Sequence, residues 1–103
     1  MLNECQGYDR ELAKVLGLET AIFLSEAINQ FQFANQEGSL IEGEWFYLTF
    51  ESVYEKTFLS RRKQEVAIKN LVEKNLIEFK LKGLPPRRCF RFKMNEMDKI
   101  IKI

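Results

Sequence analysis

The sequence predicts an α+β fold in which helices come first and a β-hairpin comes late in the chain. Apolar residues recur at helical spacing over 18–34 and again over 61–74. Over 87–93, aromatic and basic side chains alternate, which is typical of a strand with one buried face. The chain has 103 residues, 46% of them hydrophobic, so we expect a single globular domain over 1–103.

Two helices are expected at the N-terminal end, together covering residues 9–34. The stretch 8–16 has apolar residues at helical spacing, and Asp9 is a suitable N-cap. Gly17 interrupts the pattern, and a longer amphipathic helix follows it. The polar, glycine-containing stretch 35–44 is typical of a loop and sets the expected end of this second helix.

The helix expected over 18–34 has apolar residues nearly all the way round. Phe23 and Phe33 fall off its main apolar stripe. A helix that is apolar on several faces must be covered on more than one side, and a second copy of the chain would cover it. We therefore expect a homodimer formed through helix 18–34.

A short strand and two further helices are expected next. The aromatic segment 45–48 is typical of a strand, and Thr49 is a suitable N-cap for a helix that runs to about Lys56. Ser60 is a natural N-cap for the following helix, which we place at 61–74. The buried face of that helix is expected to consist of Ala67, Ile68 and Leu71.

A β-hairpin is expected over 76–93. Asn75 tolerates the left-handed conformation that ends a helix. Two strands then flank a stiff tip, Gly83-Leu84-Pro85-Pro86. Phe90 and Phe92 alternate with basic residues, and we expect both rings in the core rather than on a ligand.

Composition and motifs exclude most enzymatic chemistry. The chain has no histidine, so the commonest general base and the commonest zinc ligand are both missing. It has neither a GxxxxGK[ST] loop nor a GxGxxG motif. Cys5 and Cys89 stand too far apart for a CxxC pair or a disulfide framework. We therefore expect no enzymatic activity, no cofactor, no metal and two unreactive thiols.

Membrane insertion and secretion are not indicated by the sequence. No apolar run approaches the ~18 residues that span a bilayer. Glu4 and Asp9 are unsuited to a secretory leader. We therefore expect a cytoplasmic protein with no membrane partner.

Charge is unevenly distributed along the chain. Residues 1–52 contain nine acidic and two basic side chains, whereas residues 53–103 contain six acidic and fourteen basic ones. A basic half suits a phosphate-binding surface. Alternatively, the two halves neutralise each other on one compact surface. The isoelectric point of 7.7 favours this alternative, because strong nucleic-acid-binding domains typically exceed about 9.

The order of the expected elements is that of a winged helix-turn-helix. The elements are N-terminal helices over 9–34, a helix-turn-helix over about 50–75, a wing hairpin over 76–93 and a tail over 94–103. The tail has apolar residues at helical spacing and forms either a short helix or a lone strand. The wing sheet is expected to be antiparallel, with two or three strands.

Two segments resemble the N-terminal winged-helix domains of bacteriophage and bacterial replication-initiation proteins of the DnaD-like type. They are GLETAIFLSEAINQFQFAN and EWFYLTFESVYEKTFLSRRKQEVAIKNLVEKNLIEFKLKGLPPRRCFRF. The likeness covers about residues 10–93. Its specific parts are the Gly-Leu-Glu-x-Ala opening of a helix, the aromatic strand, the Leu-Ser-Arg-Arg start and the Lys-Gly-x-Pro-Pro-Arg wing.

The sequence departs from this family pattern at two places. A strong tryptophan position corresponds to Val53 or Tyr54, and a position that is often small or apolar is Gln64. The resemblance implies DNA binding or assembly of a replication complex. The expected function is therefore double-stranded DNA binding in replication initiation or transcription regulation. The alternative is a protein-interaction or oligomerisation module that contacts replication proteins without binding DNA.

In a helix-turn-helix, the start of the second helix contacts base edges in the major groove, and basic wing residues contact the backbone or the minor groove. The arginine fork matches guanine edges or two phosphate oxygens, which makes Arg61 and Arg62 the principal candidates. The full expected DNA-binding set is Ser60, Arg61, Arg62, Lys63, Val66, Lys69, Lys80, Lys82, Arg87 and Arg88. Otherwise these side chains form ordinary solvated surface.

Overall fold

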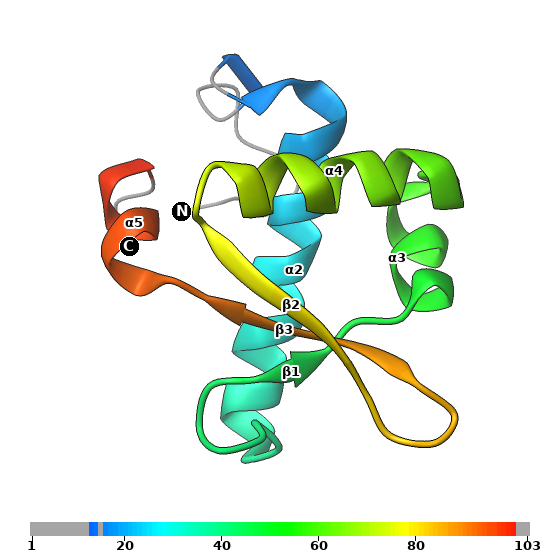
Figure 1. Cartoon of the computed structure of the whole chain (residues 1–103), viewed down its shortest axis with the longest axis vertical. Helices are drawn as coiled ribbons and strands as arrows, with labels where there is room; N and C mark the ends of the chain where they lie inside the picture. Colours follow the sequence, from blue (N-terminus) through cyan, green and yellow to red (C-terminus); the bar gives the residue numbers. More distant parts are fainter. Residues whose placement is uncertain (1–12, 15, 101–103) are drawn as a thin grey trace.

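The structure, a computed structural model, describes residues 13, 14 and 16–100. Its helices are α2 (Leu18–Glu37), α3 (Phe50–Thr57), α4 (Arg61–Glu73) and α5 (Met94–Ile100). Its strands β1 (Phe46–Tyr47), β2 (Ile77–Lys82) and β3 (Arg87–Phe92) form an antiparallel sheet in the order β1-β3-β2 (Figure 1). This mixture of helices and a small antiparallel sheet is the α+β class that the sequence predicts. Most of the helix expected over 8–16, with its cap at Asp9, lies outside the described residues, although residues 13, 14 and 16 are helical.

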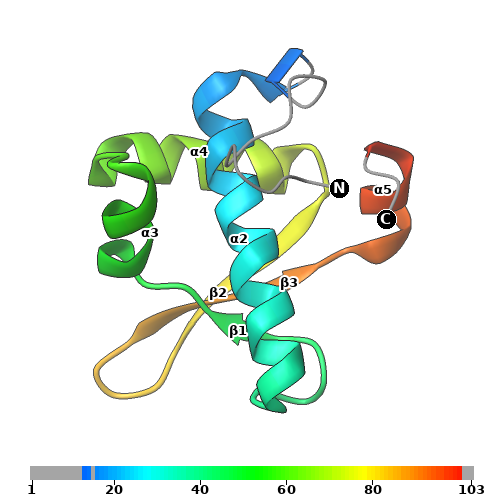
Figure 2. The ribbon, with the colours of Figure 1, turned by 180° about the vertical axis from the view of Figure 1, so that it is seen from behind.

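Helix α2 runs along the back of the molecule, behind α4 and the sheet (Figure 2). It packs against α4, α3 and β1, and the first half of the helix is buried nearly all the way round. Phe23 is fully buried and contacts Phe90 of β3, whereas Phe33 near the other end remains 60% exposed. Packing within one chain therefore accounts for the apolar residues on several faces of this helix. That removes the observation from which a dimer through helix 18–34 was expected.

The end of α2 differs from the sequence prediction. The helix continues to Glu37 instead of ending near residue 34, because the polar residues after Ala34 are compatible with a helix. It ends where Gly38 adopts a left-handed conformation (φ 72°), and the Gly38 N–H caps the carbonyls of Ala34 and Asn35. Glycine, rather than the change to polar residues, is thus the stop signal here.

The caps expected for α3 and α4 are both present. The Thr49 hydroxyl oxygen accepts a hydrogen bond from the Ser52 N–H, and that of Ser60 accepts one from the Lys63 N–H, each at 3.2 Å. Helix α4 ends one residue earlier than expected, at Glu73, and Asn75 is left-handed as predicted (φ 65°). The buried side chains of α4 are Gln64, Ala67, Ile68 and Leu71.

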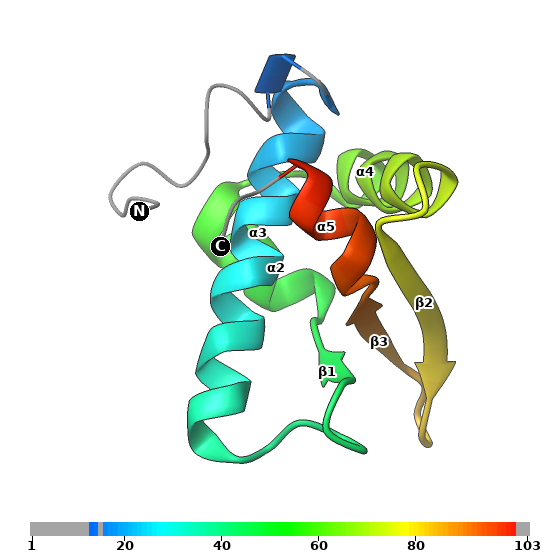
Figure 3. The same ribbon diagram turned by 90° about the vertical axis from the view of Figure 1, so that its left-hand side faces the viewer.

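The sheet presents one face to α2. Phe31 of α2 contacts Phe46 and Phe92 at ring-centroid distances of 5.7 and 5.4 Å, and Phe90 and Phe92 are both buried, as expected. The expected strand 45–48 is shorter than predicted, since only Phe46 and Tyr47 pair with β3. No described helix covers the opposite face of the sheet, which points away from α2 (Figure 3).

The described part of the tail beyond the hairpin, Met94–Ile100, is a helix rather than a strand. Helix α5 begins directly after β3, and its Met97 is buried in the core. The N–H groups of Glu96 and Met97 donate to the Lys93 carbonyl, which starts the helical turn. Among the described residues, none of the helices combines the length and the apolar character needed to cross a membrane.

Candidate nucleic-acid interface

The first turn of α4 presents three cations that point in different directions. Arg61, Arg62 and Lys63 follow the Ser60 cap, and all three are exposed. Because a helix turns by about 100° per residue, Arg62 lies opposite the buried stripe while its two neighbours lie on the flanks. Lys69, two turns later, lies on the same outward face as Arg62 and is also exposed.

Arg61 is held by an aromatic ring rather than by a carboxylate. Its guanidinium lies over the Phe50 ring, 4.3 Å from the centroid. Within the described part of the chain, neither Arg61 nor Arg62 forms an ion pair. Both guanidinium forks therefore have donors available for an anionic ligand.

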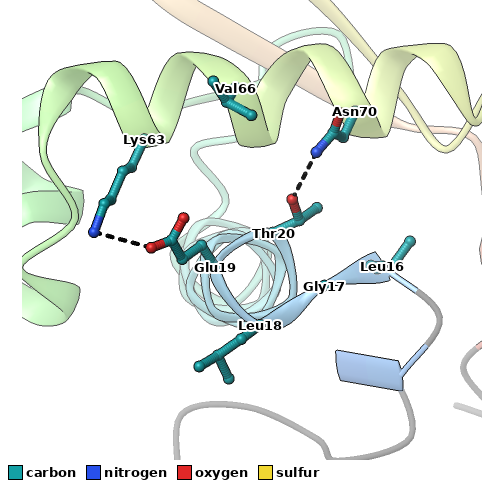
Figure 4. Close-up of a pocket in the computed structure, with 8 residues that line it drawn as sticks. All are labelled: Leu16, Gly17, Leu18, Glu19, Thr20, Lys63, Val66 and Asn70. Carbon is teal, nitrogen blue, oxygen red and sulfur yellow. Dashed lines mark hydrogen bonds and ion pairs between the residues drawn. The ribbon is translucent and has the colours of Figure 1, made fainter.

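Lys63 is directed differently, toward the start of α2. Its ammonium group lies 2.9 Å from a carboxylate oxygen of Glu19 (Figure 4). Val66 and Asn70 lie on the same flank of α4, and Asn70 donates a hydrogen bond to Thr20 at 3.1 Å. This flank faces the N-terminal turn of α2 and lines a shallow pocket of about 300 Å³. An exposed ion pair of this kind is weak, so Lys63 can exchange Glu19 for another anion.

Arg88 braces the hairpin against the two helices. Its Nε donates to the Leu48 carbonyl and its Nη2 to the Gln64 side-chain oxygen, both at 2.9 Å. The fully buried Gln64 in turn donates to the carbonyls of Leu59 and Phe50, at 3.0 and 3.3 Å. The Nε and Nη2 atoms of Arg88 and the Nε2 atom of Gln64 thus all donate to partners within the protein. We therefore assign Arg88 to the fold and not to the ligand-binding set.

The environment of Arg88 also shows that the start of α4 lies beside the hairpin. Burial lowers the pKa of Arg88, and the nearby positive charge of Arg61 lowers it further. Glu51 and Glu65 partly offset these effects. Arginine nevertheless keeps its charge at physiological pH. The exposed guanidinium of Arg61 and the part of the hairpin next to its tip therefore belong to one region of the surface.

The remaining hairpin cations lie on the other face of the sheet. Side chains alternate between faces along a strand, so Lys80, Lys82 and Arg87 share the face opposite that of Arg88. Lys80 lies over the Trp45 ring (4.1 Å from the centroid), and Arg87 lies over the Tyr47 ring (3.9 Å). The wing residues expected to act together are therefore divided between two faces.

This face also carries an internal charge cluster. Arg91 pairs with Glu78 at 2.6 Å and with Glu44 at 2.9 Å. The hydrogen bond from Arg91 lowers the pKa of Glu78, and the two carboxylates raise the pKa of Arg91. An acidic residue from the first half of the chain thus neutralises a basic residue from the second half, as Glu19 does for Lys63.

Cys89 lies between the strands as a buried thiol. Burial raises its pKa, although the charges of Lys80, Lys82 and Arg87 act in the opposite direction. A raised pKa leaves little thiolate at neutral pH, so this cysteine is poorly placed to act as a nucleophile or metal ligand. Cys5 lies outside the described residues. No group of three or more acidic or cysteine side chains in the described part of the chain is placed to hold a metal ion.

The sequence reasoning missed an aromatic strip along α3. Phe50 stacks on Tyr54 (ring centroids 5.7 Å apart), and Tyr54 meets Phe58 edge-on at 5.8 Å. Tyr54 is 44% and Phe58 76% exposed. The spacing i, i+4, i+8 places the three rings on one face, but it does not say whether that face is buried. We call this set the α3 aromatic strip.

Comparison of the chain with protein-family models, with curated proteins and with solved structures gives no match. The resemblance described above therefore rests on the motifs of this sequence, and the function is argued from the surface.

Proposed function

We propose that this chain is a winged helix-turn-helix protein that binds double-stranded DNA. The arrangement that supports the proposal is α3 and α4 joined by the three residues 58–60, followed by a hairpin. The α3 helix, the start of α4 and the hairpin tip lie on the same side of the molecule (Figure 1). In such a fold, α4 is the recognition helix and the hairpin is the wing.

One observation carries the proposal. Arg61 and Arg62 are exposed at the capped start of α4, and no described carboxylate neutralises them. This is the part of a recognition helix that meets base edges. The Phe50 ring holds Arg61 on the hairpin side of α4 and leaves its donor edge free, while Arg62 projects outward. Each fork matches guanine O6 and N7 or two phosphate oxygens.

The other cations fit phosphate contacts. Lys69 lies along the outward face of α4, and Lys82 and Arg87 form a cross-strand pair at the hairpin tip. The Ser60 hydroxyl oxygen accepts the capping hydrogen bond, and the hydroxyl proton can still be donated to a phosphate. These contacts fix position on the duplex, whereas the forks at the start of α4 read sequence. Given the resemblance to replication initiators, we place the activity in phage or bacterial replication initiation or transcription regulation.

The proposal is tested with a duplex-binding measurement on the Arg61→Ala/Arg62→Ala variant. We expect affinity to fall at least tenfold at fixed salt, because a good bidentate contact is worth about 1–3 kcal/mol. Fluorescence anisotropy with a labelled duplex measures this. The Lys14→Ala/Lys74→Ala variant removes the same charge from exposed positions away from the start of α4 and should change affinity little. Equal losses in the two variants would mean that only net charge matters, and the α4 site would be abandoned.

The salt dependence gives a second readout. If Arg61, Arg62, Lys69, Lys82 and Arg87 each neutralise one phosphate, the log–log slope of affinity against salt should be roughly −4.5. Removing the two arginines should reduce its magnitude by about 2. A slope that is unchanged by the double substitution contradicts phosphate or base contact by these residues.

The α3 aromatic strip favours a second candidate function, a protein-interaction module of a replication complex. Exposed aromatic residues beside an arginine are typical of interaction hot spots. Phe58 also has a left-handed backbone (φ 61°), which is costly for a residue with a side chain and is commonest where function requires it. In this case Phe58→Ala would abolish partner binding and leave duplex affinity unchanged. Co-purification with replication proteins would be the readout.

A further inference from the structure

The uncovered face of the sheet combines aromatic rings with cations that form no ion pair with any carboxylate of the described residues. Tyr47 lies in β1 and Trp45 directly precedes this strand, and Lys80, Lys82 and Arg87 come from the hairpin. We call these five residues the outer-sheet patch. These side chains alternate along the strands with Phe90, which packs on Phe23 of α2, so the patch lies on the other face of the sheet, the one that points away from α2 (Figure 3). It does not include Arg61 or Arg62.

The charge of the outer-sheet patch is well defined. The acidic residues at its edge, Glu44 and Glu78, are both engaged by Arg91, and the Lys93 ammonium lies 3.8 Å from Glu78, so two cations balance two carboxylates. The cations of the patch have no such partner within the described residues. One end of the sheet face is thus neutral, and the end toward the hairpin tip is positive, which favours a polyanion.

Stacking on the two rings requires exposed base faces, which a duplex does not offer. Trp45 and Tyr47 are half-buried, and cations lie over both rings: Lys80 and Arg91 over Trp45, and Arg87 over Tyr47. Base–aromatic stacking is stronger than an exposed cation–π contact, so a base can displace the cation, which then pairs with phosphate. In a duplex the faces of the bases are already stacked. Only an unpaired strand offers both a free base face and a phosphate.

The spacing of the rings agrees with this requirement. Residues two apart on a strand lie about 6.6 Å apart on the same face. This is roughly twice the spacing of about 3.4 Å between stacked nucleotides of one strand. Two bases held on Trp45 and Tyr47 must therefore be separated from each other, as in an extended single strand.

We propose that the outer-sheet patch binds single-stranded DNA, with bases stacked on Trp45 and Tyr47 and phosphates paired with Lys80, Lys82 and Arg87. This activity is separate from duplex binding by the start of α4. A protein that opens or follows an opened duplex needs both kinds of contact. The two sites share Lys82 and Arg87 at the hairpin tip, whereas Arg61 and Arg62 belong only to the duplex site and Trp45 and Tyr47 only to the single-strand site.

The single tryptophan of the chain reports directly on this site. Titration with oligothymidylate of about 12 nucleotides should quench Trp45 fluorescence, whereas a fully paired DNA duplex of equal length should not. With three phosphates neutralised, the salt slope for the single strand should be roughly −2. Binding detected by anisotropy without any quenching would place the strand elsewhere and overturn the proposal.

Substitution separates the two surfaces. Tyr47→Ala removes a ring and keeps all the cations, and it should weaken single-strand binding by about tenfold while leaving duplex affinity within twofold. Arg61→Ala/Arg62→Ala should show the reverse pattern, so failure of either site is recognised independently. Phe58→Ala, which removes an exposed ring outside the patch, is the matched control. Thermal melts establish that each variant is folded.

Three results would refute the assignment. The first is an equal loss of single-strand affinity in Phe58→Ala and Tyr47→Ala. The second is quenching by the duplex as strong as by the single strand. The third is tighter binding of an RNA oligomer, oligouridylate of the same length, than of oligothymidylate, because the proposed ligand is DNA.

Discussion

At the scale of single residues, Gln64 and Arg88 join more elements than any single apolar contact does. Gln64 lies on the buried stripe of α4 and bonds to the backbone of the α3 region, while Arg88 links it to the end of β1 and to β3. In the sequence, Gln64 stands out only because the corresponding position of the family is often small or apolar. The structure supplies the reason, since the buried amide donates to two carbonyls and accepts from the Arg88 guanidinium, which an apolar side chain could not do.

Replacing the Gln64 side chain tests whether its hydrogen bonds stabilise the fold. Gln64→Leu keeps the volume but removes the acceptor for Arg88 Nη2 and the donor to the carbonyls of Leu59 and Phe50. We expect the free energy of unfolding to fall by at least about 2 kcal/mol in urea denaturation. Gln36→Leu, at an exposed position of α2, is the control and should change it by less than about 0.5 kcal/mol. Similar losses in the two variants would show that the hydrogen bonds of Gln64 contribute nothing specific.

The ion pairs around Arg91 predict a pH dependence. The hydrogen bond from Arg91, aided by the charges of Arg91, Lys93 and Lys80, lowers the pKa of Glu78 against the opposing effect of burial. A carboxyl whose pKa is lower in the folded state stabilises the protein above its unfolded pKa, and this stability is lost as pH falls through the folded pKa. The stability difference between wild type and Glu78→Gln should therefore be largest at neutral pH and disappear in acid.

Urea unfolding across that acidic range measures the difference. Glu73→Gln serves as the comparison, because Glu73 is exposed on α4 and forms no ion pair with the part of the chain that the structure describes. A stability difference for Glu78→Gln that does not change with pH would argue against the ionised pair as its source.

At the scale of elements, the connection between α3 and α4 is the most informative. The α3 helix ends at Phe58, whose N–H caps the Tyr54 carbonyl in a left-handed conformation. Glycine or asparagine normally occupies this position, and Asn75 does so after α4. An exposed phenylalanine at a strained cap lowers stability without filling the core. We infer that the ring is kept for its surface and not for the fold.

Phe58→Gly should therefore stabilise the protein. Relief of the left-handed strain is worth about 1 kcal/mol, and the lost ring is largely in solvent. We expect the melting temperature to rise by roughly 4 °C or more, by circular dichroism. Phe58→Ala removes the ring but keeps a Cβ in the left-handed region, so it should give no such rise. If both variants melt below wild type, the ring itself supports the helix-turn-helix.

At the scale of the whole molecule, the charge segregation seen along the sequence is only partly kept in space. Glu19 and Glu44, from the acidic half, neutralise Lys63 and Arg91, from the basic half. The basic residues that remain fall into two groups, one at the start of α4 and one on the outer-sheet patch. The late cations therefore do not form a single ridge, and the hairpin-tip residues Lys82 and Arg87 are shared by the two proposed sites.

The packing of α2 has a consequence for assembly. Most of its apolar residues are buried or half-buried within the chain, and Leu18 and Phe33 are its exposed large apolar residues. We expect a mass of one chain, 12.2 kDa, by light scattering at high micromolar concentration. A mass of two chains that returns to one in Phe33→Ser would instead restore the interface expected at helix 18–34.

By itself, the sequence determined the α+β class, both helix caps, the left-handed Asn75, the hairpin and the burial of Phe90 and Phe92. These features follow from local rules of spacing, capping and alternation, which depend on neighbours along the chain. Tertiary structure alone decided that Arg88 is internal, that Lys63 pairs with Glu19, and that the hairpin cations lie over Trp45 and Tyr47. Each of these contacts joins residues more than twenty positions apart, so side-chain direction and burial, rather than residue type, determine which charges remain free for a ligand.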